Sequence, residues 1–200
     1  MGNVRKKWHL CKISKEIRAD MAMWIEFLKN FNGRALMHDE EWDDAVHIYT
    51  DASTSVGFGA VFGDKWIQGE WGDKEGNIDI TVLELYAVAA AVFTWGENLR
   101  DKKVVIHSDN MPVVEVLNDC SSKSPNLMKI IRPLVLQAMR LNIVLKAIHI
   151  PGVENVRADA LSRSDFQAFW EAHPTAKQYP CRVPMAASSK TLLKNVTRWY

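Results

Sequence analysis

Four acidic residues stand at positions where a folded chain could gather carboxylates: Asp51, Glu84, Asp109 and Asp159. Asp51 and Asp109 each end a short apolar stretch, in YTDAS and IHSDN, and side chains at such strand ends form ligand sites in open α/β sheets. Glu84 lies within TVLELYAV, and Asp159 near the start of NVRADALSR. Carboxylate oxygens suit Mg²⁺. Two such ions about 4 Å apart can activate water and relieve phosphate charge in phosphodiester cleavage. The set predicts a site for two Mg²⁺ ions, with Mn²⁺ as a substitute.

Each acid alone also has an ordinary structural explanation. An aspartate at a strand end is often a turn or cap residue, and a glutamate in an apolar helix often lies where core meets solvent. Asp159 could simply favour the positive end of a helix dipole. The combination favours a metal site, because the acids fall in the order strand end, helix, strand end, helix start.

The elements that would position these acids follow from apolar periodicity and turn residues. Three segments rich in β-branched and aromatic residues predict a meander, followed by alternating helices and strands. The expected strands are 46–51, 57–63, 63–71, 103–109 and 142–150, and the expected helices are 80–99, 111–119, 124–142 and 154–163. Asp79 or Thr81 would cap the first helix, and Pro133 would kink the third or begin it anew.

This order predicts an α/β fold with a mixed five-stranded sheet, in which three antiparallel strands precede parallel strands and helices cover both faces. Glycines within 57–63 indicate that another backbone or a ligand approaches that strand closely.

The chain divides into three expected parts: a helical lead-in at 1–45, a compact domain at 46–164 and a tail at 165–200. In the lead-in, apolar residues recur at three- and four-residue spacing and predict one face of a helix: Ile17, Met21, Trp24, Ile25 and Leu28. Asn32-Gly33 is expected to end this helix. The tail has no acidic residue after position 174, which predicts a basic, loosely ordered segment that is either solvated or in contact with nucleic acid.

Composition sets broad limits. The net charge of +1 argues neither for nor against a polyanionic partner, because metal ions can cancel the charge of clustered carboxylates. Three cysteines without a CxxC pair favour a reducing, intracellular compartment, either cytoplasm or nucleus. No run approaches 18 apolar residues, so no membrane span is expected.

The segments TDAS, LEL, SDN and ADALSR resemble the type 1 ribonuclease H family. The resemblance implies a ribonuclease H-like fold and an endonuclease that hydrolyses the RNA strand of RNA–DNA hybrids. It implies that Asp51 bridges both ions, that Glu84 and Asp109 complete one site, and that Asp159 completes the other. His149, within HIPGVENVRAD, matches a family histidine on a mobile loop that assists proton transfer or product release; a strand-end histidine without a role stays open.

Residues beside the acids are candidates for holding the hybrid. Ala52, Ser53 and the strand of Gly57–Gly59 could sense the 2′-hydroxyl by close backbone approach. Asn110 either contacts sugar or base edges or caps the next helix. Arg157 and Arg163 could hold phosphates, with surface ion pairs as the alternative.

Longer segments are more similar to the ribonuclease H portion of gypsy-like and DIRS-like retrotransposons. These are TDAS..GFGAV, LEL.AV and HIPG.EN..ADALSR. In the lead-in, FLKNFNG resembles the segment that joins the polymerase thumb to the ribonuclease H domain in the DIRS-like group, and the resemblance as a whole covers roughly residues 15 to 165. It implies an upstream reverse transcriptase polymerase domain as a partner. Only CSSKS stands where cellular relatives have a basic helix and loop. Two alternatives remain. The first is a catalytically silent module that only binds nucleic acid or supports a polymerase. The second is another nuclease, such as a DDE integrase or a proofreading exonuclease, although an acid on a helix, as Glu84 is, fits that alternative less well.

Overall fold

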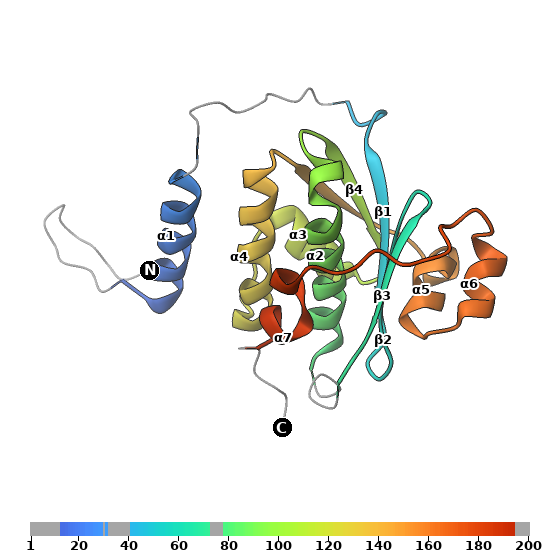
Figure 1. Cartoon of the computed structure of the whole chain (residues 1–200). Helices are drawn as coiled ribbons and strands as arrows, with labels where there is room; N and C mark the ends of the chain where they lie inside the picture. Colours follow the sequence, from blue (N-terminus) through green and yellow to red (C-terminus); the bar gives the residue numbers. More distant parts are fainter. Residues whose placement is uncertain (1–12, 30, 32–40, 73–77, 195–200) are drawn as a thin grey trace, which may run out of the picture. The chain divides into compact units, whose positions relative to one another are not determined.

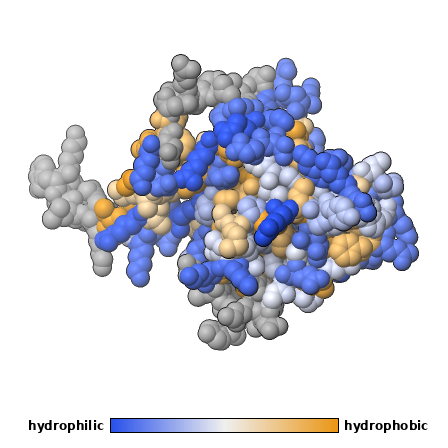
Figure 2. Space-filling view, in the orientation of Figure 1, coloured by the Kyte–Doolittle hydropathy of each residue, from blue (hydrophilic) through white to orange (hydrophobic). Residues whose placement is uncertain are grey.

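The computed structural model describes residues 13–29, 31, 41–72 and 78–194, which form parts of two compact units, 1–34 and 35–200 (Figure 1). In the first unit, α1 (Lys15–Leu28) begins at Ser14, whose hydroxyl accepts a hydrogen bond from the Ile17 amide at 3.2 Å. The residues predicted to form its apolar face are each at least half exposed: Ile17, Met21, Trp24, Ile25 and Leu28. Apolar surface is accordingly visible on this helix in Figure 2. The expected stop at 32–33 lies outside the described residues.

The second unit is built on the predicted mixed sheet, with strand order β3-β2-β1-β4-β5. β1 pairs antiparallel with β2 and parallel with β4, while β2–β3 is antiparallel and β4–β5 is parallel. The strands are β1 (Val46–Ala52), β2 (Gly57–Phe62), β3 (Lys65–Glu70), β4 (Lys103–Ser108) and β5 (Val144–His149). The α/β fold class and the five-stranded topology are therefore confirmed. The adjacency of β1 and β4 brings two acid-bearing strand ends to one edge.

Helices cover both faces of this sheet, as predicted (Figure 1). One face carries α2 (Ile80–Leu99), α3 (Met111–Asp119) and α4 (Pro125–Arg140). The other carries α5 (Val156–Ser162), after the short 3-10 turn η1 (Gly152–Glu154), and α6 (Phe166–Ala172). Asp79 caps α2 by accepting a hydrogen bond from the Thr81 amide at 2.9 Å. α4 continues through Pro133 and does not begin anew there.

Helix α2 is the centre of the hydrophobic core. Its side chains from Leu85 to Val92 are almost wholly buried, and α4 packs on its outer side. By length and composition alone α2 could cross a membrane, but 72% of its most apolar 18-residue stretch is buried inside this fold. Its apolar character is therefore accounted for by packing against the sheet and α4. Glu84 lies within this apolar helix and is itself buried, so its carboxyl group is removed from water.

A glycine in β2 lets α5 approach the sheet closely, as the sequence indicates. A Cβ atom at Gly59 would lie 2.3 Å from the Cβ of Leu161 and 2.9 Å from the carbonyl oxygen of Ala158. Gly59 is paired with Asp51 in the sheet, so the missing side chain allows α5 to lie beside the first acid. Only glycine leaves this space without moving α5 away.

The tail differs from the expectation of a loosely ordered segment. Residues 165–194 pack against the rest of the second unit: Phe169 is wholly buried beside Trp66, and the Trp66 indole donates to the Lys177 carbonyl at 2.7 Å. Further along, the buried Tyr86 hydroxyl donates at 2.9 Å to the carbonyl of Ala187, which ends η2 (Met185–Ala187) shortly before α7 (Ser189–Leu192). Isolated aromatic and small apolar residues anchor this segment, and they give no periodic pattern in the sequence.

Candidate metal centre

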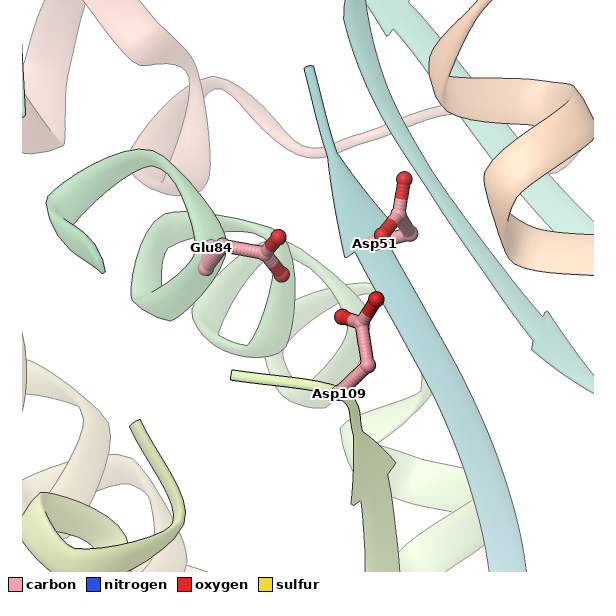
Figure 3. Close-up of side chains that lie close together, drawn as sticks. All are labelled: Asp51, Glu84 and Asp109. Atoms are coloured by element: carbon pink, nitrogen blue, oxygen red, sulfur yellow. The ribbon is translucent and has the colours of Figure 1, made fainter. Parts of the chain in front are cut away.

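Three of the four predicted acids meet at one end of the sheet. Asp51 comes from β1, Asp109 directly follows β4, and Glu84 reaches them from α2 (Figure 3). One carboxylate oxygen from each residue lies within 4.8 Å of the others. The two aspartates converge because β1 and β4 are neighbouring parallel strands, and Glu84 joins them because α2 packs on β1. The carboxylates point toward one another although their charges repel (Figure 3).

Glu84 is the most buried acid of this group, with 4% of its surface exposed. Burial raises the pKa of Glu84 to about 9, and the neighbouring charges of Asp51 and Asp109 act in the same direction. The backbone amide of Ala52 donates a hydrogen bond to this carboxyl group, which opposes the rise of its pKa. Its Oε2 atom is buried and finds no hydrogen-bond partner among the described residues.

Asp51 is also buried, with 5% of its surface exposed. Burial raises the pKa of Asp51 to about 6, although a hydrogen bond from the Ser162 hydroxyl to its Oδ2 atom acts against the rise. The charges of Asp109 and Asp159 raise this pKa further. The chain therefore holds carboxyl groups together in surroundings that disfavour their ionised forms.

A divalent cation would fit this site. It would supply the positive charge that the clustered carboxylates lack, and it would give the orphaned Glu84 oxygen a partner. The donors are all oxygens, which is the ligand set that Mg²⁺ and Mn²⁺ take. Asp51, Glu84 and Asp109 are thus the residues that could hold the predicted ions.

Asp159 does not belong to this close group, so the expectation that all four acids converge is not confirmed for Asp159. It lies in the first turn of α5, and one of its oxygens accepts a hydrogen bond from Arg163 Nε at 2.7 Å. Its side chain is 41% exposed. The Ser162 hydroxyl contacts both Asp51 and the Asp159 carbonyl, so Asp159 lies at the rim of the same site, and its charge contributes to the raised pKa of Asp51. Arg163 was also a candidate phosphate ligand. It forms an ion pair with Asp159, four residues before it, which is the surface ion pair that the sequence analysis gave as the alternative.

The sequence analysis did not single out Ser162, which connects Asp51 to α5. Ser162 is fully buried, and its hydroxyl lies within hydrogen-bond reach of both Asp51 Oδ2 and the Asp159 carbonyl. Its own carbonyl accepts a hydrogen bond from the Ser53 hydroxyl at 2.9 Å. The ADALSR segment contains this serine three residues after Asp159, but only the packing of α5 on β2 reveals its partner.

Replacing Ser162 by alanine is expected to weaken Mn²⁺ binding about tenfold, because the Asp51 carboxylate would lose the donor that fixes one of its oxygens. Isothermal titration calorimetry of the parent and the variant would measure this. Ser164→Ala is a matched control, because the Ser164 hydroxyl accepts from Gln68 and has no contact with the acids. Equal Mn²⁺ affinity in the parent and in Ser162→Ala would show that this hydrogen bond does not prepare the site.

The remaining predicted residues lie around the acids. Asn110 caps α3, since its side-chain oxygen accepts from the Val113 amide at 3.2 Å. The hydroxyl of Ser53 organises the β1–β2 turn by accepting from the amides of Val56 and Gly57. His149 is the last residue of β5, and its Nε2 lies 3.1 Å from the Asp109 carbonyl oxygen. This histidine therefore lies beside the site at a strand end.

Two further contacts escaped the sequence analysis. Gly152 lies against the third acid: a Cβ atom there would be 3.0 Å from Asp109 Oδ2, so the β5–α5 loop closes over this carboxylate. The guanidinium group of Arg157 lies over the Tyr49 ring at 4.7 Å and makes no ion pair among the described residues. Neither contact has a signal in the local sequence, because both join segments far apart in the chain.

Comparison with known proteins agrees with the fold. Residues 41–137 match the family described as the RNase H-like domain found in reverse transcriptase, a range that contains Asp51, Glu84 and Asp109. No curated protein matches the chain.

Solved structures of low sequence identity are also similar. RNase H1 of Halobacterium salinarum is 21% identical, with 60% of this chain and 98% of that chain covered and a TM-score of 0.47. LC11-RNase H1, solved in complex with an RNA/DNA hybrid, is 23% identical. The match covers 61% of this chain and 99% of that chain, with a TM-score of 0.46. The protease-reverse transcriptase of prototype foamy virus is 12% identical. The match covers 72% of this chain and 20% of that chain, with a TM-score of 0.37. On the family match, residues 41–137 of this chain belong to the RNase H-like domains of reverse transcriptases.

Proposed function

We propose that this protein is a divalent-metal-dependent endonuclease that hydrolyses the RNA strand of RNA–DNA hybrids. The observation that carries the proposal is the group of Asp51, Glu84 and Asp109, whose oxygens lie within 4.8 Å of one another in a domain of the reverse transcriptase RNase H-like family. The buried, unpartnered oxygen of Glu84 supports a cation at this place. The pattern of carboxylates suits phosphodiester hydrolysis better than any chemistry that needs a nucleophilic side chain.

The chain's own residues would divide the work as follows. Asp51, Glu84 and Asp109 would hold the ions, with Asp159 at the rim completing the set. When bound, two Mg²⁺ ions supply an activated water and charge relief on the phosphate. Ser162 would keep the Asp51 carboxylate in one orientation. His149, exposed beside Asp109, would carry a proton to or from the bulk solvent.

Contacts within the protein limit which of the candidate residues can also bind the hybrid. The Ala52 amide already donates to Glu84, and the Ser53 hydroxyl already serves the β1–β2 turn and α5. We therefore assign Ala52 and Ser53 to the wall of the site, where their backbone shape limits the approach of a sugar. Asn110 keeps its amide nitrogen for a sugar or base edge while its oxygen caps α3.

The wider setting is part of the same proposal. The resemblance to gypsy-like and DIRS-like elements supports a retrotransposon polyprotein as the origin of the domain, with a polymerase domain upstream as its partner. Hybrids arise where RNA is copied into DNA, so we place the protein inside the cell, in the cytoplasm or the nucleus.

The proposal predicts strand-selective cleavage. Purified protein with Mg²⁺ is expected to cut the labelled RNA strand of a hybrid, leaving a 3′-hydroxyl and a 5′-phosphate, and to leave the DNA strand intact. Gel analysis of the hybrid, a DNA duplex and single strands of the same sequence would measure this. Equal cleavage of the DNA duplex would indicate a different nuclease, and no cleavage of any substrate would indicate a silent module.

A further inference from the structure

On the α5 side of the sheet, a group of rings and two cations lies on and around β1, β4 and β5, next to the apolar side chains of Val105 and Ile148. Helix α5 packs mainly on β1 and β2. Residues of this face alternate along the strands. His47 and Lys146 are exposed, whereas Trp42, Tyr49, His107 and Arg157 are partly buried. We call this surface the β4–β5 face and define it by Trp42, His47, Tyr49, His107, Lys146 and Arg157.

A continuous stack of rings and a cation crosses this face. The Arg157 guanidinium lies 4.7 Å from the centre of the Tyr49 ring, and Tyr49 stacks on His107 with centroids 4.4 Å apart and planes 10° apart. His107 in turn stacks on His47 at 5.1 Å, and the two imidazoles share a hydrogen bond of 2.8 Å. The stack fixes the direction of the arginine side chain, which would otherwise be free to rotate.

The cations of this face are held by aromatic rings and not by carboxylates. Lys146 Nζ lies 5.2 Å from the centre of the Trp42 ring, which repeats the arrangement of Arg157 over Tyr49. In the described part of the chain, neither Lys146 nor Arg157 forms an ion pair or a side-chain hydrogen bond. Their N–H groups are therefore available to an anion from outside.

The stack directly adjoins the acid group. Tyr49, His107 and Arg157 each stand two residues before an acid, namely Asp51, Asp109 and Asp159. Tyr49 and His107 lie on or next to the strands that carry their acids, and two residues of a strand span roughly 7 Å. Arg157 and Asp159 lie on helix α5, and the contact of Arg157 with Tyr49 connects this arginine to the same end of β1. A polyanion that approaches the acids is repelled by them, and a fixed cation one step away would offset that repulsion.

Resting on the proposed function, we propose that the β4–β5 face binds the phosphate backbone of the hybrid beside the acid group, with Arg157 and Lys146 as the phosphate ligands. The Tyr49 hydroxyl and the Nε2 atom of His47 would add hydrogen bonds to the same strand, because His47 Nδ1 is already bonded to His107. This contact is independent of sequence, which suits an enzyme that must cut hybrids of any sequence.

The test is the salt dependence of hybrid binding in EDTA, where no cleavage occurs and metal binding plays no part. Fluorescence anisotropy of a labelled RNA–DNA hybrid would be measured for the parent, Arg157→Gln, Lys146→Gln and the double variant. Each single variant is expected to lower the slope of log affinity against log salt by about 0.9, and to weaken binding roughly five- to tenfold near 0.1 M salt. Arg157→Lys should keep most of the parent slope, because it keeps the charge.

A matched control exists on the opposite edge of the sheet. Lys65 on β3 also lies over an aromatic ring, that of Phe62, at 5.4 Å, so Lys65→Gln removes an equivalent cation away from the proposed contact. It should leave the slope unchanged.

Parent-like slopes in Arg157→Gln and Lys146→Gln, or no hybrid binding by the parent, would overturn the proposal and would favour an acidic protein as the partner of this face. Because binding in EDTA and cleavage in Mg²⁺ are separate measurements, a failure here differs visibly from a failure of the proposed nuclease activity.

Discussion

Replacing Asp51 by asparagine is expected to slow hybrid cleavage in Mg²⁺ by at least about a thousandfold, while the fold persists. The amide has the shape of the carboxylate and can still accept the hydrogen bond from Ser162, so packing should be preserved. The variant removes one of three carboxyl groups that each offer an oxygen within 4.8 Å of the others, and a cation would be held correspondingly weakly. Single-turnover cleavage rates of the parent and the variant, with circular dichroism for the fold, would measure the effect.

A matched control is Asp64→Asn on the β2–β3 turn. Asp64 is half exposed, lies 3.7 Å from Lys177 and is remote from the acid group. Its replacement should leave the cleavage rate within about twofold of the parent, since exposed ion pairs contribute little. If Asp51→Asn and Asp64→Asn cleaved equally well, Asp51 would not take part in the reaction.

The stability of the metal-free protein is expected to fall as the pH rises from about 5 to about 9. Burial raises the pKa of Glu84 from 4.5 to about 9, so between these values the folded protein keeps a proton that the unfolded chain releases. The unfolded state then binds fewer protons than the folded state, and the free energy of unfolding decreases with pH. A single group titrating in this way contributes at most about 1.4 kcal/mol per pH unit.

Urea unfolding in EDTA at several pH values would measure this dependence. Asp51 adds to it at the acid end, since its pKa is raised from 3.8 to about 6. Glu84→Gln should flatten the profile and make the metal-free protein more stable than the parent near pH 8. The control Glu97→Gln lies on the same helix but is exposed and paired with Arg100 at 2.9 Å, so it should keep the parent profile. A parent stability that is constant or rises over this range would contradict the burial of an ionisable Glu84.

Saturating Mg²⁺ should reverse the trend, because the ion binds the ionised carboxylates of the folded state only. The gain in stability on adding Mg²⁺ is therefore expected to be larger at pH 8 than at pH 5.

The sequence predicted the elements whose signals are local. Helices α2 and α3 have the predicted bounds, because Asp79 and Asn110 are capping residues immediately before apolar, helix-forming segments. The meeting of Asp51 and Asp109 was also predictable, since both end apolar strands that must be neighbours in a sheet of this order. The α/β class followed from the sequence of strands and helices alone.

The parts that could not be predicted depend on contacts between distant residues. Ser162 meets Asp51 across 111 positions, and this contact exists only because Gly59 lets α5 lie close to β2. Asp159 was expected beside the other acids, but Arg163 one turn later on α5 engages its carboxylate. The tail was expected to be loose because its anchors, such as Phe169 and Ala187, are isolated apolar residues without helical or strand periodicity.

The central claim is that clustered acids of this RNase H-like domain bind divalent cations that hydrolysis requires. Its most direct test is one reaction followed over time: purified protein and labelled hybrid in Mg²⁺, then excess EDTA, then excess Mg²⁺ again. We expect cleavage of the RNA strand to begin, stop on chelation and resume when the metal ion returns. Cleavage that continues in EDTA, or its absence with both Mg²⁺ and Mn²⁺, would contradict the account.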